Sequence, residues 1–255
     1  MFVRNILSAI IISVAPVSSV LAAGGDTPPI PSQDWSFSGP FGTYDKAALQ
    51  RGYKIYREVC ASCHSMKRVR FRNLEALGYN EDQIKAIAAE YSVEDGPNED
   101  GDMFERAALP SDAFISPFPN DNAAKAANGG AFPPDLSLMT KARANGSNYV
   151  HALMTGYKDK LPHGVELSDG QYWNTYFTGN KIAMAPPLMD ESISYEDGTI
   201  ETLDQYAKDI SHFLTWAADP YMEERKRTGF KVILFLLIFA GVMYGVKRRI
   251  WSNIH

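Results

Sequence analysis

The chain has 255 residues and a formal net charge of −5, which is divided unevenly along it. Residues 24–222 hold 17 Lys and Arg against 28 Asp and Glu, whereas residues 223–255 hold seven basic residues against two Glu. An acidic body with a basic tail argues against nucleic acid as a partner and favours a basic protein. The length allows one substantial domain with a small addition.

Residues 1–23 have the pattern of a secretory signal peptide. Arg4 supplies the positive charge, 6–20 form the apolar core, and Leu21-Ala22-Ala23 resembles a small-residue cleavage site. An uncleaved membrane anchor is the alternative, but the apolar run is short and contains Pro16. We expect cleavage near Ala23 and, for a bacterial signal, a mature protein in the periplasm.

A haem attachment motif follows the first predicted helix. Residues 24–42 are rich in Pro and Gly and should form an extended arm packed on the body, and the spacing of apolar residues then predicts a helix over 45–59. That helix leads into Cys60-Ala61-Ser62-Cys63-His64, which contains both cysteines of the chain. Two thiols at this spacing add to the vinyl groups of a haem, and the next histidine becomes an axial iron ligand. We therefore predict one covalent c-type haem and no disulfide.

Two other kinds of site use a Cys-x-x-Cys pair. A structural zinc ion needs two further Cys or His ligands at matching spacing, and the chain has no second Cys pair. A thioredoxin-like redox pair needs a strand–helix–strand setting, which the sequence pattern does not show. Covalent haem remains the prediction that the residues favour.

The region after the motif is predicted to be helical with long loops. Its basic residues Lys67, Arg68, Arg70 and Arg72 fit a solvated face, with a partner or haem propionate contact as the alternative. Asn80 and Gln83 form a capping box for a helix that reaches Tyr91. Residues 94–102 form an acidic loop whose ligand spacing does not match an EF-hand. Further helices are expected over 123–128, 135–144 and 148–156, the first of them ending at Gly129, and residues 157–200 should be mostly loop.

The C-terminal part contains two predicted helices. Thr202 and Gln205 suggest a second capping box, for a helix that ends at Asp219 and has an apolar face. That face consists of Leu203, Tyr206, Ile210, Phe213 and Ala217. Pro220 suits the first position of an anchor helix that reaches Trp251. Within it, residues 228–246 match the thickness of the hydrocarbon layer, whereas a buried core helix would be less uniformly apolar.

These elements give a domain organisation and a topology. The signal peptide directs the haem domain, residues 24–219, to the periplasm, and the anchor over 220–251 leaves a cytoplasmic tail at 247–255. Strand signals are weak throughout. The predicted fold is mainly α: a class I c-type cytochrome-like haem domain with long loops, plus one C-terminal transmembrane helix.

The second axial ligand decides the function of the haem. A strong ligand gives electron transfer, whereas an open iron site allows gas binding or peroxide chemistry. Met184 is the preferred candidate, because small neighbours and Pro186-Pro187 can bring a stiff loop to the haem. The alternatives are Met189, Met154, His151, His163 and His212. His151 and His212 lie in predicted helices, where packed or surface histidines are the commoner case.

Several motifs occur in one order along the chain. They are Cys60-Ala61-Ser62-Cys63-His64, Asp95-Gly96-Pro97-Asn98-Glu99-Asp100-Gly101, the run from Asn128 to Ser137, Ala183-Met184-Ala185-Pro186-Pro187, and Glu224-Arg225-Lys226-Arg227 before the anchor. Together they resemble the cytochrome c1 family, the haem subunit of the quinol–cytochrome c oxidoreductase or cytochrome bc1 complex. The resemblance covers about residues 35–251.

The resemblance implies roles for particular residues. It implies that His64 and Met184 are the axial pair. It also implies haem contacts in which Arg143 pairs with a propionate, Tyr149 approaches the same group, and Asn128 and Pro133 line the cleft. Some bacterial relatives carry an extra cysteine pair and a long insertion before the ligand methionine. This chain has neither, so we expect packing and proline alone to hold its ligand loop.

The resemblance also implies an electron-transfer role without substrate chemistry in this chain. One electron would come from the Rieske iron–sulfur protein and pass to a soluble periplasmic cytochrome c, beside cytochrome b in a dimeric complex of the bacterial inner membrane. Asp190, Glu191, Glu196 and Asp197 follow Met184 and should lie near the haem edge, where they would attract a basic cytochrome. The alternatives are a free-standing anchored cytochrome that feeds an oxidase, and a haem enzyme or sensor with an open iron site.

Overall fold

Two helices, α1 (Lys46–Glu58) and α6 (Leu203–Ala218), cross at the centre of the body. The computed structural model describes residues 28–252, so the predicted signal peptide and its cleavage site lie outside the described residues. A Cβ atom added at Gly52 of α1 would lie 2.2 Å from the carbonyl oxygen of Asp209, so only glycine lets the two backbones approach this closely. The helix predictions over 45–59 and 202–219 are confirmed.

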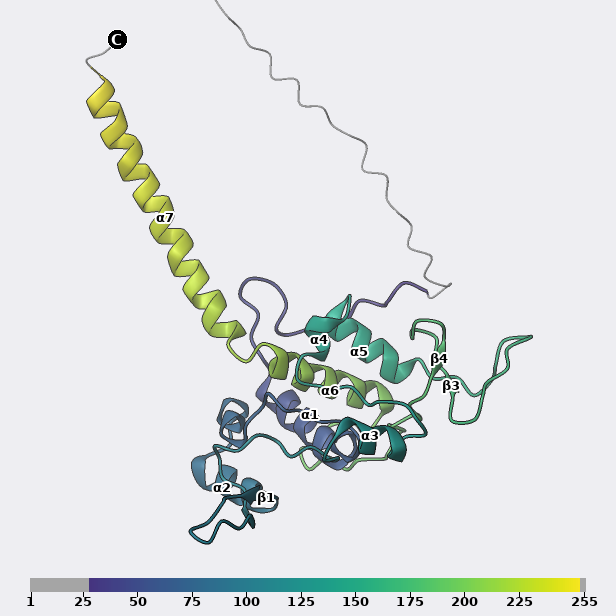
Figure 1. The fold of residues 1–255 in the computed structure, drawn as a ribbon. Helices are drawn as coiled ribbons and strands as arrows, with labels where there is room; N and C mark the ends of the chain where they lie inside the picture. Colours follow the sequence, from purple (N-terminus) through teal and green to yellow (C-terminus); the bar gives the residue numbers. More distant parts are fainter. Residues whose placement is uncertain (1–27, 253–255) are drawn as a thin grey trace, which may run out of the picture.

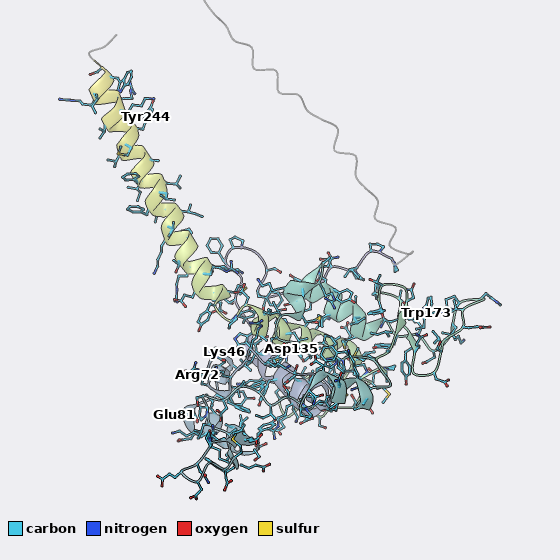
Figure 2. The ribbon with its side chains drawn as sticks, in the orientation of Figure 1. Lys46, Arg72, Glu81, Asp135, Trp173 and Tyr244 are labelled. Atoms are coloured by element: carbon cyan, nitrogen blue, oxygen red, sulfur yellow. The ribbon has the colours of Figure 1, made fainter. Side chains whose placement is uncertain are left out.

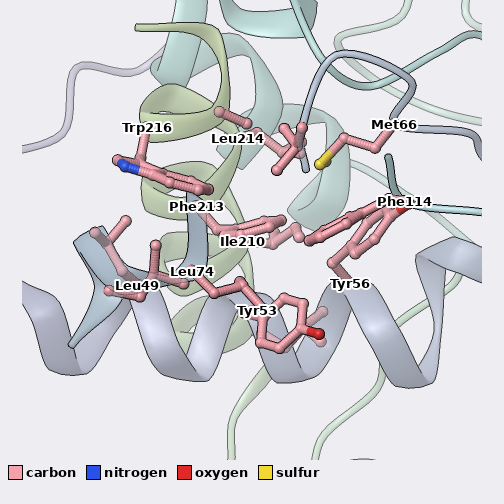
Figure 3. Packing of buried hydrophobic residues seen from close by; sticks show 14 of the residues in the cluster. Leu49, Tyr53, Tyr56, Met66, Leu74, Phe114, Ile210, Phe213, Leu214 and Trp216 are labelled. Carbon is pink, nitrogen blue, oxygen red and sulfur yellow. The ribbon is translucent and has the colours of Figure 1, made fainter. Parts of the chain in front are cut away.

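The core between these helices is aromatic. Figure 3 shows Tyr53 and Tyr56 of α1 gathered with Phe213 of α6 and Phe114, and each tyrosine ring lies 5.7–5.8 Å from both phenylalanine rings. The 3₁₀ helix η2 (Phe71–Leu77), which the sequence pattern did not predict, closes the same core from one side with Phe71, a residue only 1% exposed. Each large side chain buried in this way contributes about 1.5–3 kcal/mol to stability.

A hairpin lies where the sequence predicted only an acidic loop. Helix α2 (Glu81–Ala89) starts at the predicted capping box, in which Asn80 and Gln83 exchange hydrogen bonds of 2.9 Å. Strands β1 (Ser92–Asp95) and β2 (Phe104–Ala107) then pair antiparallel, and the acidic loop is their connection. The sequence pattern does not predict these strands, because they are four residues long and their residues do not alternate between apolar and polar.

The next three helices lie near the predicted ranges, but one of them, α4, is much shorter than predicted. Helix α3 (Asp121–Ala127) is capped by the Asn120 side chain and ends before Gly129, whose φ of 60° is left-handed as expected. The helix predicted over 135–144 is only α4 (Met139–Ala142), because residues 135–137 are tied by hydrogen bonds to residues 65–68 instead. Helix α5 (Gly146–Thr155) packs against α6.

Residues 156–202 are mostly loop, as predicted. Two short strands, β3 (Tyr172–Trp173) and β4 (Lys181–Ile182), pair antiparallel within them. Asn174 is fully buried beside this ladder, and its amide donates to the Leu153 carbonyl 2.8 Å away. The first part of the segment is thus organised by polar contacts, whereas Leu188, Ile193 and Tyr195 belong to the apolar core.

The long helix α7 (Met222–Trp251) leaves the body at one end (Figure 1). It is the one helix of the described residues that is long and apolar enough to cross a membrane. The prediction that Pro220 begins it was wrong: α7 starts at Met222, because residues 219–221 form a turn in which Asp219 pairs with Lys141 at 2.9 Å and Arg225 at 2.7 Å. The prediction of a second capping box is confirmed only in part. The Thr202 side chain accepts a hydrogen bond from the Gln205 backbone amide, but the Gln205 side chain does not bond back to the Thr202 amide.

Candidate haem site

The haem motif forms a tight turn directly after α1. The 3₁₀ helix η1 (Cys60–Ser62) continues the chain, and the backbone amides of Cys63 and His64 both donate to the Cys60 carbonyl, at 3.2 and 2.9 Å. Both cysteines carry free thiols and are partly exposed. The turn therefore presents two thiols and one imidazole as a single unit at the end of the central helix.

The imidazole of His64 is fixed in one tautomer. Its Nδ1 lies 2.8 Å from the carbonyl oxygen of Pro134, and because a carbonyl only accepts, Nδ1 carries the hydrogen and Nε2 keeps its lone pair. Burial lowers the pKa of His64, against the opposing effects of the Pro134 carbonyl and Asp135. A neutral imidazole with a free Nε2 is the form that binds iron.

Asp135 locks the segment that supplies this carbonyl. Its carboxylate accepts hydrogen bonds from Ser65 Oγ, Lys67 N and Ser137 N, each at 2.9 Å. Burial alone would raise the pKa of Asp135, but these hydrogen bonds hold it below the usual range. Figure 2 places Asp135 in the centre of the body, far from Trp173 of β3. The Phe132-Pro133-Pro134 run indicated a stiff, extended segment, but nothing in the sequence indicated that Pro134 and Asp135 orient His64.

A surface cleft opens beside Cys63. The residues that line it are Cys63, Ser65, Lys67, Ser116, Pro117, Phe118, Pro119, Asn120, Asp121, Ala124, Phe132 and Pro133. Asn128 is the C-cap of α3, and its amide donates to the carbonyl of Ala124 at 2.8 Å. Among the predicted site residues, the structure therefore brings Cys63 and Pro133 to one cleft, with Asn128 supporting its wall.

Arg143 and Tyr149 form a second group. Arg143 is exposed at the end of α4, and Tyr149 is half-buried on α5. Burial raises the pKa of the Tyr149 hydroxyl, while the nearby positive charge of the Arg143 guanidinium lowers that pKa. The two residues that the resemblance assigned to one propionate thus lie against each other.

Met184 lies half-buried on the loop that follows β4. Its backbone carbonyl accepts a hydrogen bond from the Tyr157 hydroxyl at 3.1 Å. Burial, and then the nearby phenol of Tyr149, raise the pKa of Tyr157, so the hydroxyl stays protonated and donates. The expectation that packing and proline alone hold this loop was therefore wrong. No sequence pattern indicated a role for Tyr157, which lies 27 residues before Met184.

The other candidate ligands have different surroundings. Met189 is 67% exposed and His163 lies in an exposed loop, whereas Met154 packs against the core. His151 Nε2 contacts Asp204 Oδ1 at 2.9 Å, and His212 Nε2 contacts Ser36 Oγ at 3.2 Å. Both helical histidines are thus buried in polar contacts within the protein.

The donor set around Cys60, Cys63 and His64 fits a c-type haem. Two unbridged thiols and a neutral imidazole are the groups that covalent attachment and axial ligation require. Over residues 28–252, no three His, Cys, Asp or Glu side chains are grouped to hold a metal ion by themselves. Both sheets described there are antiparallel pairs, so a thioredoxin-like setting gains no support.

Comparison with known proteins agrees with this chemistry. The model of the Cytochrome C1 family matches residues 35–254. "Cytochrome c1" of Rhodospirillum rubrum is 48% identical over 237 residues, which cover 87% of each chain. "Cytochrome c1-2, heme protein, mitochondrial" of Solanum tuberosum is 52% identical over 223 residues, 87% of this chain and 85% of that protein.

A third relative is much longer than this chain. "Cytochrome b/c1" of Bradyrhizobium diazoefficiens is 49% identical over 253 residues, which cover 91% of this chain and 36% of the relative. The chain thus spans about a third of that protein's length. The resemblance seen in the sequence motifs is confirmed over nearly the whole body and anchor. The chain belongs to the cytochrome c1 family and carries that family's covalently bound c-type haem.

Proposed function

We propose that the chain is the electron-transfer haem subunit of a cytochrome bc1 complex. It accepts one electron from a Rieske iron–sulfur protein, passes it to a soluble periplasmic cytochrome c, and works beside cytochrome b in a dimeric assembly. The observation that carries the proposal is the His64 imidazole, which is held neutral beside two free thiols in a chain of this family. A Candida albicans relative, 43% identical, is named "Cytochrome b-c1 complex catalytic subunit, mitochondrial".

Each site residue has a role in this proposal. The haem supplies one-electron redox chemistry when it is bound. Cys60 and Cys63 would hold it covalently, and His64 and Met184 would be the two ligands of its iron. A thioether ligand favours reduced iron and gives a high potential. Four more residues act around the group: Arg143 and Tyr149 at a propionate, and Asn128 and Pro133 at the cleft wall.

The proposed topology follows from the two ends of the chain. The haem domain, residues 24–219, lies in the periplasm after removal of residues 1–23. The anchor over 220–251 crosses the inner membrane, with its span at about 228–246, and residues 247–255 are cytoplasmic. The exposed apolar surface of α7 supports the span, because no other part of residues 28–252 covers these side chains.

Charge steering brings the acceptor cytochrome to the proposed site. Within the acidic group after Met184, Asp197 is paired with Arg51 at 2.7 Å, and Asp190 accepts from Leu203 N at 2.7 Å. All four carboxylates are exposed, and Glu196, whose side chain is 96% exposed, contacts Lys54 only at 4.0 Å. Reduction of a basic cytochrome c should therefore slow as ionic strength rises from about 0.01 to 0.15 M. A rate that does not change over this range would remove the steering argument.

Purification from membranes tests the whole proposal. We expect the chain to co-purify in mild detergent with a cytochrome b and a Rieske protein. We also expect that carbon monoxide does not change the spectrum of its reduced haem. If the chain purifies without these two subunits and carbon monoxide leaves its spectrum unchanged, a free-standing anchored cytochrome would be favoured. A spectral shift with carbon monoxide would show an open iron site and would favour an enzyme or sensor.

A further inference from the structure

A tight loop of the N-terminal arm carries one large aromatic residue at its tip. The amide of Ser38 donates to the Trp35 carbonyl at 2.9 Å, and that of Thr43 to the Ser36 carbonyl at 3.0 Å. A Cβ atom added at Gly42 would lie 2.1 Å from the Ser38 carbonyl oxygen, so the loop closes only with glycine there. The loop thus has one shape, and it projects Phe41.

The base of this loop is rooted in the haem domain. The ring of Phe37 stacks on Trp35 at 5.4 Å and meets the edge of His212, on α6, at 5.0 Å. Trp35 is 6% exposed, and its Nε1 donates to Asn148 Oδ1 at 2.7 Å. Contacts of this kind hold the loop to the body at several points.

The tip of the loop is held against α7. The ammonium group of Lys226 donates to the carbonyls of Phe37 at 2.7 Å and Gly42 at 3.1 Å. The ring of Phe41 meets the edge of the Phe230 ring, with 5.9 Å between centroids. Figure 1 shows the loop rising beside the base of α7. One cation and one aromatic pair therefore connect the loop to the first turns of the membrane helix.

Phe41 lies where the apolar surface of α7 begins. Its side chain is 77% exposed, and Phe230 is the first of the exposed large apolar side chains that continue along the helix to Trp251. Since a helix rises 1.5 Å per residue, Arg227 lies about 4.5 Å above Phe230, at the level expected for lipid phosphates. A ring beside Phe230 is thus placed at the boundary between head groups and acyl chains, where aromatic residues are favoured.

We propose that Phe41 inserts into the lipid on the body's side of the membrane, as a second membrane contact beside α7. Lipid is the occupant because the Phe41 ring extends the apolar surface of the span itself, and the neighbouring basic residues suit phosphate groups. Because the loop is rooted in the haem domain and held to α7, this contact restrains the tilt of the domain over the membrane. The proposal rests on α7 being a membrane span.

Site-directed spin labelling in the intact complex tests this contact. Both native cysteines of this chain are joined to the haem, so a cysteine introduced by Phe41→Cys is its single labelling site. The unchanged complex, labelled in the same way, measures the background from the other subunits. The complex is reconstituted into phospholipid nanodiscs, and the label's collision rates with oxygen, which dissolves in lipid, and with a water-soluble nickel chelate are measured. Matched controls are Leu237→Cys on α7, 67% exposed, and Glu99→Cys on the exposed β1–β2 connection.

The expected result is a Phe41 label that favours oxygen over nickel severalfold more than the Glu99 label does. A label as open to nickel as that at Glu99 would overturn the proposal. A label shielded from both reagents would also overturn it, because another protein subunit would then cover Phe41. If the Leu237 label is open to nickel as well, the membrane span itself is wrong. An unchanged haem spectrum confirms that each labelled complex is folded.

Discussion

The residues that present His64 and those that present Met184 are held by different kinds of interaction. On the His64 side, α1 ends in the haem motif, and its inner face is packed in an aromatic core with residues such as Tyr53 and Phe213 that are 0–3% exposed. On the Met184 side, two-residue strands and polar contacts organise the chain before the methionine, and Tyr157 ties the loop by one hydrogen bond. The chain returns to the apolar core only at Leu188.

This difference separates stability from redox tuning. Burial of large apolar side chains supplies most of the folding free energy, so the His64 side should unfold only with the whole domain. A hydrogen bond such as that from Tyr157 contributes about 0.5–1.5 kcal/mol, so the Met184 loop can open without global unfolding. Substitutions on the His64 side should therefore affect folding, and substitutions on the Met184 side should affect the redox potential of the iron.

The largest effect is expected from Gly52→Ala, a substitution in the packed helices on the His64 side. The added methyl group meets the backbone of α6 at 2.2 Å and the Phe213 Cβ at 2.6 Å, so the helices must separate. Overpacking of this kind costs about 1–3 kcal/mol and more when backbone must move. We expect much less of the haem-containing chain in membranes and a lower midpoint of thermal unfolding. Gly241→Ala, with no atom within 4 Å of the new Cβ, is the control; equal midpoints for both variants would contradict the close crossing.

Met184→Leu removes the thioether on the Met184 side. Haem should stay attached through Cys60 and Cys63, and the thermal midpoint should change little. Loss of the thioether should lower the potential by on the order of a few tenths of a volt, within the roughly 0.8 V that axial ligands span. A redox titration and carbon monoxide binding measure the effect. A potential equal to that of the unchanged protein would move the ligand role to Met189 or a histidine, and Met189→Leu is the matched control.

The central helices were predictable because their signals are local. Apolar spacing fixed the core faces of α1 and α6, the Asn80–Gln83 box fixed the start of α2, and the Cys60–His64 motif identified the haem. The sequence also indicated Arg143 and Tyr149 through the resemblance, and the structure places them together. Each of these signals lies within a few residues of the feature that it predicts.

The contacts that orient the site were not predictable, because their partners are far apart in the chain. Pro134 and His64 are separated by 70 residues, and Tyr157 and Met184 by 27. A backbone carbonyl as acceptor leaves no mark on the sequence, since every residue has one. The shortened α4 has the same cause: Asp135 looked like a helix start but bonds to Ser65 and Lys67 instead.

Tyr157→Phe sharpens the comparison with a smaller change. It removes the hydroxyl that donates to the Met184 carbonyl and keeps the ring, so the domain should lose no more than about 1.5 kcal/mol of stability. The loop should open more often, so we expect a lowered potential and measurable carbon monoxide binding. Tyr172→Phe, on the neighbouring strand and 38% exposed, is the control. If both variants behave alike, the Tyr157 hydrogen bond does not position the ligand.

The smallest effect is expected from pH, through His151 and His212 on the packed side. Burial lowers the pKa of both, although Asp204 opposes this at His151, and the Lys208 carbonyl opposes it at His212. As the pH falls below about 6.5, these histidines therefore take up protons in the unfolded chain before they do so in the folded chain. Their contribution to the free energy of unfolding is thus fully present above that pH and is lost as the pH falls further. His212→Gln should reduce the fall in thermal midpoint between about pH 7.5 and 5.5. His163→Gln, at an exposed position, is the control. An equal fall in the unchanged protein and in both variants would show that His212 does not contribute to it.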